Sequence, residues 1–344
     1  MSLNKEDSSF RGSTEINNTC STYKKQCSGW LSLLRIPNLF TLPGDVILGF
    51  MIAESSLENS DFILGFSYSR GVFLSLNIFY ILIAIFSVYC FGLITNDLAD
   101  FYEDAESRPE RPLPAGIISK KSARIAALLF ALSGLLFAGF ANQKTFIAVL
   151  GLLFLVIGYN YFLKKNILLG PFALGLCRTL SVVVGFLGAG LNFEVYPPMF
   201  YIVSLIWFLY FFAISLVAYH ETEDQSHTRG AYVFLLIPLV WGITVPFASD
   251  ALGVVLIVGE LPPGLFLAVG AFLVFSLFIV KNFISLKLQS PSPLIVQKSV
   301  GELIRSIIFL QASGCAFLGY PYIALALFLL WFPPRILAGR FYSS

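Results

Sequence analysis

The amino-acid sequence predicts an all-α fold: a polytopic membrane helical bundle with nine or ten transmembrane helices and two polar loops on its cytoplasmic side. The first observation is composition, since 57% of the 344 residues are hydrophobic and 12% are charged. A typical soluble domain carries about twice that share of charge. The second observation is a mean hydropathy of +0.81. The third is the length of the apolar runs, which suits a bilayer and leaves only short loops between them.

The apolar runs give the number of predicted spans. A transmembrane helix needs about 20 mostly apolar residues. Runs close to this length occupy residues 30–53, 71–95, 123–141, 145–163, 167–190, 198–219, 231–248 and 262–281. A last region, 302–332, is long enough for one span and a second, shorter one. The count is therefore nine, or ten if this region is a hairpin.

The polar N-terminus precedes these spans. Residues 1–28 are rich in Ser and Thr and lack the short apolar core and small-residue cleavage site of a signal peptide. We expect a disordered cytosolic tail over 1–28, followed by a single helical membrane domain over 29–344.

Basic residues in the loops predict the orientation. Lys and Arg concentrate in the tail and in the even-numbered loops, most of all between 108 and 124. Short loops rich in Lys and Arg face the cytoplasm. The N-terminus and both polar loops, 96–120 and 220–230, are therefore expected on the cytoplasmic side.

The segment NDLADFYEDAESRPERPLPAG follows the second span and is the most informative part of the sequence. If the span continues as a helix, Asp97, Asp100 and Asp104 fall on one face. Such carboxylates repel one another unless a cation neutralises them, and their hard oxygen atoms suit Mg²⁺. Arg108 and Arg111 follow, and Arg is well shaped to bind phosphate. The pattern predicts a magnesium–diphosphate site, the alternative being a solvated loop that ends a helix at its prolines.

This pattern, N-D-x-x-D-x-x-x-D followed by R-P-L-P-x-G, resembles the first signature of the UbiA superfamily of intramembrane prenyltransferases. The matching residues are Asn96, Asp97, Asp100, Asp104, Arg111, Pro112, Leu113, Pro114 and Gly116. The segments LRIPNLFT, which contains Asn38, and YNYFLKK, which contains Tyr159 and Lys164, are also similar to segments of the family. The resemblance covers most of residues 30–316.

The resemblance implies a reaction and a set of site residues. The helices are expected around a central cavity, where a prenyl group passes from an isoprenyl diphosphate to an aromatic or other lipophilic acceptor. The implied catalytic residues are Asp97, Asp100, Asp104 and Asp224. Mg²⁺ is the implied cofactor, held by Asp97, Asp100, Asp104, Glu221 and Asp224. The implied substrate-binding residues are Asn38, Asn96, Arg108, Arg111, Tyr159, Lys164 and Arg178.

The second polar loop, YHETEDQSHTRG, departs from the family pattern of D-x-x-x-D or D-x-E-x-D. Aligned on Asp224, His220 replaces the earlier aspartate and Thr222 replaces the middle acid. Glu221 and Asp224, three residues apart, can share a metal ion if the loop is helical. A solvated turn remains the alternative for the loop. A non-catalytic protein that binds prenyl groups or lipids is the corresponding alternative for the chain.

Two further charges lie inside predicted spans. Ionisable residues within a membrane are functional candidates and usually have a partner. Arg178 either reaches the substrate diphosphate or pairs with Asp45. The segments around these two residues and the C-terminal YPYIALALFLLWFPPRILAGR are similar to the EboC-like branch of the superfamily.

Partners and location follow from the same observations. We expect an integral protein of a bacterial inner (plasma) membrane, in contact with membrane lipid. A net charge of +2 with no basic stripe excludes nucleic acid as a partner. A transporter would carry its polar residues at mid-membrane in broken helices, whereas the strongest polar cluster here lies at the cytoplasmic edge. The acceptor, the prenyl chain length and the oligomeric state stay open.

Overall fold

The computed structural model describes residues 25–56, 76–192, 196–219, 236, 239–241, 263–288 and 293–333. Seven helices in these ranges are long and apolar enough to cross a membrane, so the chain is an integral membrane protein. They are α4 (Leu76–Ala99), α6 (Lys120–Ala141), α7 (Gln143–Gly158) continued by the π-helix η2 (Tyr159–Leu163), α8 (Leu169–Gly188), α9 (Pro198–Tyr219), α12 (Pro263–Leu288) and α13 (Pro293–Phe317). Shorter helices are α2 (Ile36–Leu39), α3 (Leu42–Ser55), α5 (Phe101–Ser107) and α14 (Pro321–Leu329). The all-α prediction is confirmed.

The predicted last region differs from the structure in its start. α13 begins at Pro293, within the stretch predicted to lie between spans. That stretch is excluded from the predicted span because Gln297 and Lys298 are polar, but both residues are helical in the structure. The nine-residue α14 follows α13 after a turn at Gly319 and is the shorter second helix predicted for this region. The predicted span 231–248 lies mostly outside the described residues, so the total of nine or ten spans stays a prediction.

The predicted first span, 30–53, is broken, which corrects the sequence-based boundary. Residues 25–33 are helical, so the first described helix begins within the predicted tail, while 1–24 lie outside the described residues. Arg35 then adopts a left-handed conformation (φ 44°, ψ 53°) before α2 and α3. Pro37 and Pro43 lie at the starts of these two helices. Because Pro has no N–H to donate, a continuous helix through both positions is unfavourable.

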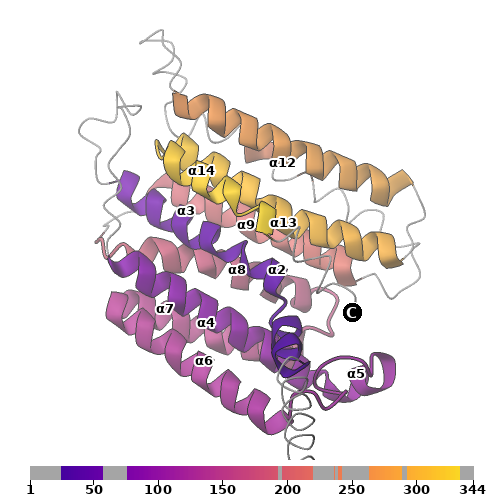
Figure 1. Ribbon diagram of the computed structural model, residues 1–344. Coiled ribbons are helices and arrows are strands. Elements are labelled where there is room, and N and C mark those ends of the chain that lie inside the picture. Colours follow the sequence, from indigo (N-terminus) through magenta and orange to yellow (C-terminus); the bar gives the residue numbers. More distant parts are fainter. Residues whose placement is uncertain are drawn as a thin grey trace, which may run out of the picture.

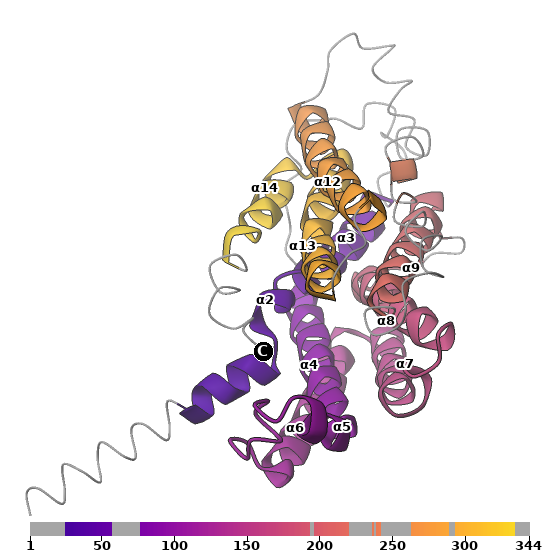
Figure 2. The same ribbon diagram turned by 90° about the vertical axis from the view of Figure 1, so that its right-hand side faces the viewer.

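The long helices run roughly alongside one another in a layered bundle (Figure 1). From one edge to the other come α6, then α4 and α7, then α8 and α3, and finally α9, α13, α14 and α12. The helix over 25–33 extends away from the bundle in the perpendicular view (Figure 2). We call the end of the bundle where α4 meets α5 the motif end.

α3 and α8 cross in the middle of the bundle at a pair of glycines. A Cβ atom on Gly49 would lie 2.0 Å from the carbonyl oxygen of Val182, and one on Gly185 would lie 2.2 Å from that of Val46. Such close backbone contact is typical of membrane helices that associate through small residues. The crossing fixes α3 against α8 and thereby places the first and fifth predicted spans side by side.

Candidate active site

The acidic motif lies at the junction of α4 and α5. The helical hydrogen bonds continue through it, since the amide of Asp100 donates to the Asn96 carbonyl (3.0 Å) and that of Asp104 donates to the Asp100 carbonyl (2.8 Å). Asp97 and Asp104 are buried. The predicted helical continuation past residue 95 therefore exists, with a break at Asp100 where α5 begins.

The RPLPAG segment folds back on the motif. Nη1 of Arg111 donates to Oδ2 of Asp104 at 2.6 Å. Gly116 adopts a φ of 69° at the turn before α6, a conformation that favours glycine. Arg108, also predicted to bind substrate, caps the end of α5 and its side chain is exposed. The structure thus brings Arg111, but not Arg108, against the acids.

The end of α7 supplies a second cation. The helix widens into η2, and π-helical turns are frequent at functional sites. Lys164, which caps η2, forms a salt bridge with Asp100 and lies 3.4 Å from Oδ1 of Asn96. The neighbouring Lys165 instead contacts Glu103 in a fully solvent-facing pair.

A third cation comes from a residue that the sequence did not single out. Nη2 of Arg35 lies 3.4 Å from Oδ1 of Asp97. The left-handed backbone of Arg35 is uncommon for a residue other than glycine and deserves a functional explanation. The signal in the sequence was its place between an apolar run and Pro37, where a helix is interrupted.

The carboxylates are therefore ion-paired one by one and do not form a preassembled metal cage. Within the described ranges, no three Asp, Glu, His or Cys side chains come close enough to hold a metal ion together. The donor chemistry nevertheless fits Mg²⁺, which needs only one or two carboxylates and takes its other ligands from phosphate and water. The remaining predicted ligands, Glu221 and Asp224, lie outside the described residues.

A central cavity of about 310 Å³ opens beside the motif. Four of the predicted substrate-binding residues line it: Asn38, Asn96, Tyr159 and Arg178. Arg35 joins them. Most of the remaining wall is apolar, with side chains such as Ile85, Leu152 and Val156, and Asn160 and Ser181 are further polar residues in it. Of the motif, Asn96 lines this cavity, and Arg35 connects it to Asp97. The cavity combines polar groups at the motif end with an oily interior.

Arg178 pairs with Asp45, which is one of the two alternatives that the sequence left open. Its Nη2 lies 2.8 Å from Oδ2 of Asp45, which is fully buried. Arg178 also lines the cavity. Arg178 is therefore part of the cavity wall with Asp45 behind it, and no described contact joins Arg178 to the acidic motif.

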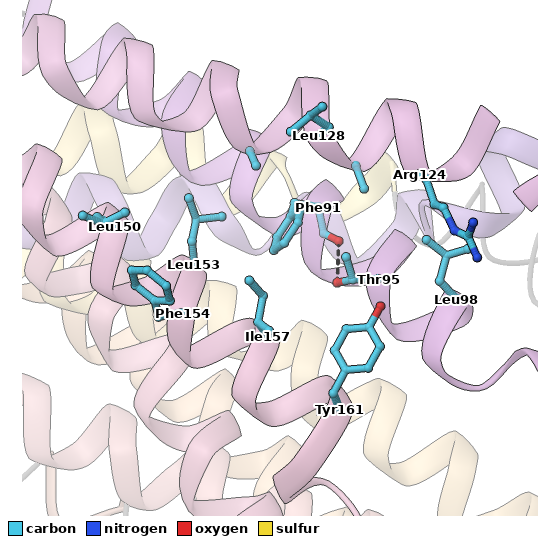
Figure 3. A pocket seen from close by; sticks show the side chains of 12 residues that line it. Phe91, Thr95, Leu98, Arg124, Leu128, Leu150, Leu153, Phe154, Ile157 and Tyr161 are labelled. Carbon is cyan, nitrogen blue, oxygen red and sulfur yellow. Dashed lines mark hydrogen bonds between the residues drawn. The ribbon is translucent and has the colours of Figure 1, made fainter. Parts of the chain in front are cut away.

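A second, apolar hollow of about 430 Å³ lies on another face of α4, between α6 and α7. Figure 3 shows Phe91, Leu128 and Phe154 along it and Arg124 at one end. Asn160 separates the two hollows, because its side-chain amide donates to Oγ1 of Thr95 at 2.7 Å and to the Gly92 carbonyl at 3.0 Å. Sequence reasoning missed Asn160, although it lies inside the Tyr-rich segment.

The sequence profile of the UbiA prenyltransferase family matches residues 62–295 of the chain. This stretch includes the complete first motif and the second polar loop.

Several curated archaeal proteins named digeranylgeranylglyceryl phosphate synthase are similar to the chain. The protein from Thermococcus sibiricus is 27% identical over 51% of this chain and 59% of its own length. The protein from Sulfolobus acidocaldarius is 26% identical over 68% of this chain and 77% of its own length. The protein from Methanococcus aeolicus is 33% identical over 41% of this chain and 45% of its own length. The chain thus spans between about half and three quarters of these relatives, and they do not single out the EboC-like branch.

Solved structures share the fold. A chain from a study of digeranylgeranylglyceryl phosphate synthase in membranes superposes with a TM-score of 0.54 at 18% identity, covering 86% of this chain and 99% of its own. A UbiA homolog from Archaeoglobus fulgidus bound to GPP and Mg²⁺ gives 0.51 at 15% identity, covering 87% and 99%. At such identities the likeness shows the fold.

Proposed function

Because this chain belongs to the UbiA prenyltransferase family, we propose that it transfers a prenyl group from an isoprenyl diphosphate to a lipophilic acceptor. The allylic C–O bond breaks and its electron pair leaves with the diphosphate. A nucleophilic atom of the acceptor then bonds to the prenyl carbon and loses a proton to water or to the diphosphate. The observation that carries the proposal is a mostly apolar cavity lined by Asn96 of the acidic motif and by Arg35, the ion-pair partner of Asp97.

The acids of the motif are suited to bind the head of the donor. Asp97 and Asp100 would hold Mg²⁺, which supplies Lewis-acid stabilisation of the charge that develops on the diphosphate. The related Archaeoglobus fulgidus protein was solved with GPP and Mg²⁺, which supports the choice of Mg²⁺ and an isoprenyl diphosphate as ligands. Asp104, bonded to Arg111, orients that guanidinium at the edge of the site.

The cations around the acids have a second task once the donor is bound. Lys164 and Arg35 now contact carboxylates, and a Mg²⁺–diphosphate unit would compete with them for the same oxygen atoms. Released from the acids, both side chains can donate to phosphate oxygens and stabilise the leaving group. The site thus exchanges one set of ion pairs for another without leaving a carboxylate uncompensated.

The cavity below the motif is suited to the prenyl chain. Its apolar wall, with Ile85, Leu152 and Val156, excludes water from the allylic cation, and Tyr89 and Tyr159 place aromatic rings there. Aromatic faces attract cations. The names of the curated relatives make a glyceryl phosphate lipid the first acceptor to try, with phenolic acceptors next.

The test is release of diphosphate by the purified full-length chain from geranyl, farnesyl, geranylgeranyl and longer polyprenyl diphosphates, with Mg²⁺ or with EDTA. We expect release that needs Mg²⁺ and falls at least about 10²-fold in Asp97→Ala and in Asp100→Ala, since the developing charge is then uncompensated. Glu106→Gln, at an exposed acid on α5, is the matched control and should retain the rate.

Absence of release with every donor would contradict the proposal. Donor binding that stabilises the protein without turnover would instead support the non-catalytic alternative, which the altered sequence of the second polar loop motivates.

A further inference from the structure

The cation Arg178 in the cavity wall pairs with an acid behind it, Asp45, and the proposed reaction uses neither. Asp45 of α3 is fully buried, and Arg178 of α8 is 8% exposed. At 1.5 Å per residue, Arg178 lies about 13 Å along α8 from its first residue at the motif end. Asn96, by the same measure, lies about 4 Å from the end of α4. The pair therefore belongs to the inner part of the cavity, below the acidic motif.

Asp45 is held from several sides. Its Oδ1 accepts from Nε1 of Trp207 at 2.8 Å and from Nε2 of Gln311 at 2.7 Å. The same Gln311 nitrogen donates to the Thr41 carbonyl at 2.8 Å. Since these residues come from α9, α13 and the start of α3, the carboxylate of Asp45 has a fixed position.

Arg178 is held less completely than its partner. The face of its guanidinium lies 4.4 Å from the centre of the Phe211 ring. Although Nη2 lies 2.8 Å from Asp45, the contact lacks hydrogen-bond geometry. Nε and Nη2 find no hydrogen-bond partner among the described residues. Unpaired donors in apolar surroundings are unfavourable, and Arg178 lines the cavity, so a ligand in the cavity can improve its bonding.

The chemistry of that ligand follows from charge. A prenyl chain is a hydrocarbon and offers no acceptor atom. An anion would face the carboxylate of Asp45, which already neutralises Arg178, so the buried group as a whole would carry a net negative charge. An uncharged oxygen atom accepts a hydrogen bond from the guanidinium without adding charge.

We propose that Arg178 binds an uncharged hydroxyl or carbonyl oxygen of the acceptor, and that Asp45 makes this position selective against anions. The inference rests on the proposed function, because it takes the cavity to hold the acceptor beside the prenyl chain. It adds the chemical class of that acceptor: a lipophilic molecule with a neutral oxygen within the inner cavity. A charged group of the acceptor, such as the phosphate of a glyceryl phosphate lipid, would have to lie outside this position.

The test uses three probes of nearly equal size: 4-hexylphenol, hexylbenzene and 4-hexylbenzoate. Their binding to the purified full-length chain is measured by calorimetry in detergent at neutral pH. We expect 4-hexylphenol to bind about tenfold more tightly than either of the others, since only it offers a neutral oxygen.

Two variants separate the roles of the pair. Arg178→Met keeps the length of the side chain and should abolish the preference for 4-hexylphenol over hexylbenzene. Asp45→Asn keeps an oxygen for Trp207 and Gln311 but leaves the charge of Arg178 uncompensated. It should therefore raise the affinity for 4-hexylbenzoate about tenfold. Arg124→Met, at the outer hollow, is the matched control and should leave the ranking unchanged.

Either single variant can fail to fold, because it breaks a buried pair. The neutral double variant Asp45→Asn/Arg178→Met avoids this and should bind all three probes without preference. Equal binding of the probes by the unmodified chain, or a preference that survives in Arg178→Met or in the double variant, would overturn the inference. Diphosphate release, measured on the same preparations without an acceptor, reports on the proposed function separately.

Discussion

Acids meet cations in two regions of this molecule, and the two regions are built differently. At the motif end, Arg35, Lys164 and Arg111 have side chains that are 41%, 15% and 16% exposed. In the interior, the side chains of Arg178 and Asp45 are 10% and 0% exposed. The motif-end cations come from a helix break, the end of η2 and a loop, whereas the interior pair lies on long helices.

The difference indicates which pairs can be exchanged. A cation at the end of an element can turn away locally when a metal ion or a diphosphate competes for its carboxylate. The Asp45–Arg178 pair lies on α3 and α8, and the backbone contact of these helices at Gly49 and Gly185 holds its two backbones at a fixed separation. The motif end is therefore suited to binding and release, and the interior pair to a fixed selection of what enters the cavity.

Breaking the interior pair should have the largest effect on stability. Asp45→Ala leaves Arg178 buried without its counter-ion, and we expect a loss of about 3–5 kcal/mol in the free energy of unfolding. Asp104→Ala at the motif end should cost less than half of that, because Arg111 can turn toward water. Reversible unfolding in mixed micelles, followed by circular dichroism, measures both. Equal losses would contradict the comparison.

Removing the cation at η2 should affect the reaction and leave the fold intact. Lys164→Gln removes a charge that can stabilise the leaving diphosphate, so release should slow about 10²-fold. Lys165→Gln is the matched control, since that side chain is 79% exposed and its pair with Glu103 contributes little. A Lys165 effect as large as that of Lys164 would show that only the overall charge of the loop matters.

Replacing the loop arginine, Arg111, should slow diphosphate release less than replacing Lys164 does. Arg111 donates a hydrogen bond to Asp104 at the edge of the site. Arg111→Gln should lower the rate of diphosphate release about tenfold, as is typical when a residue that positions a metal ligand is replaced. Arg108→Gln, at an exposed position in the same loop, should stay within about twofold. Initial rates at saturating Mg²⁺ distinguish these outcomes, and a reversed order would contradict the assignment of Arg111.

Much of the motif end could be predicted because it is local in the sequence. Helical spacing alone predicted that Asp97, Asp100 and Asp104 follow one another along a helix, and i→i+4 hydrogen bonds at Asp100 and Asp104 continue past residue 95. The helix breaks at Asp100, and each acid pairs with a different cation, so the common face stays a prediction. The family resemblance singled out Lys164 as a substrate-binding residue, which stays a prediction, and the structure adds its salt bridge with Asp100. The role of Arg35 could not be predicted, since its contact with Asp97 spans 62 positions and depends on a left-handed backbone.

By itself the sequence determined that lipid surrounds the chain, roughly where most of the described spans lie and which residues carry the acidic motif. These properties depend on local composition and helical periodicity, which each segment carries alone. Tertiary structure decided that the first span breaks around Arg35, that each motif acid faces a separate cation, and that Asp45 pairs with Arg178. The reason is that a buried charge takes whichever partner the packing of distant helices brings within reach, and the crossing of α3 with α8 brings these two together.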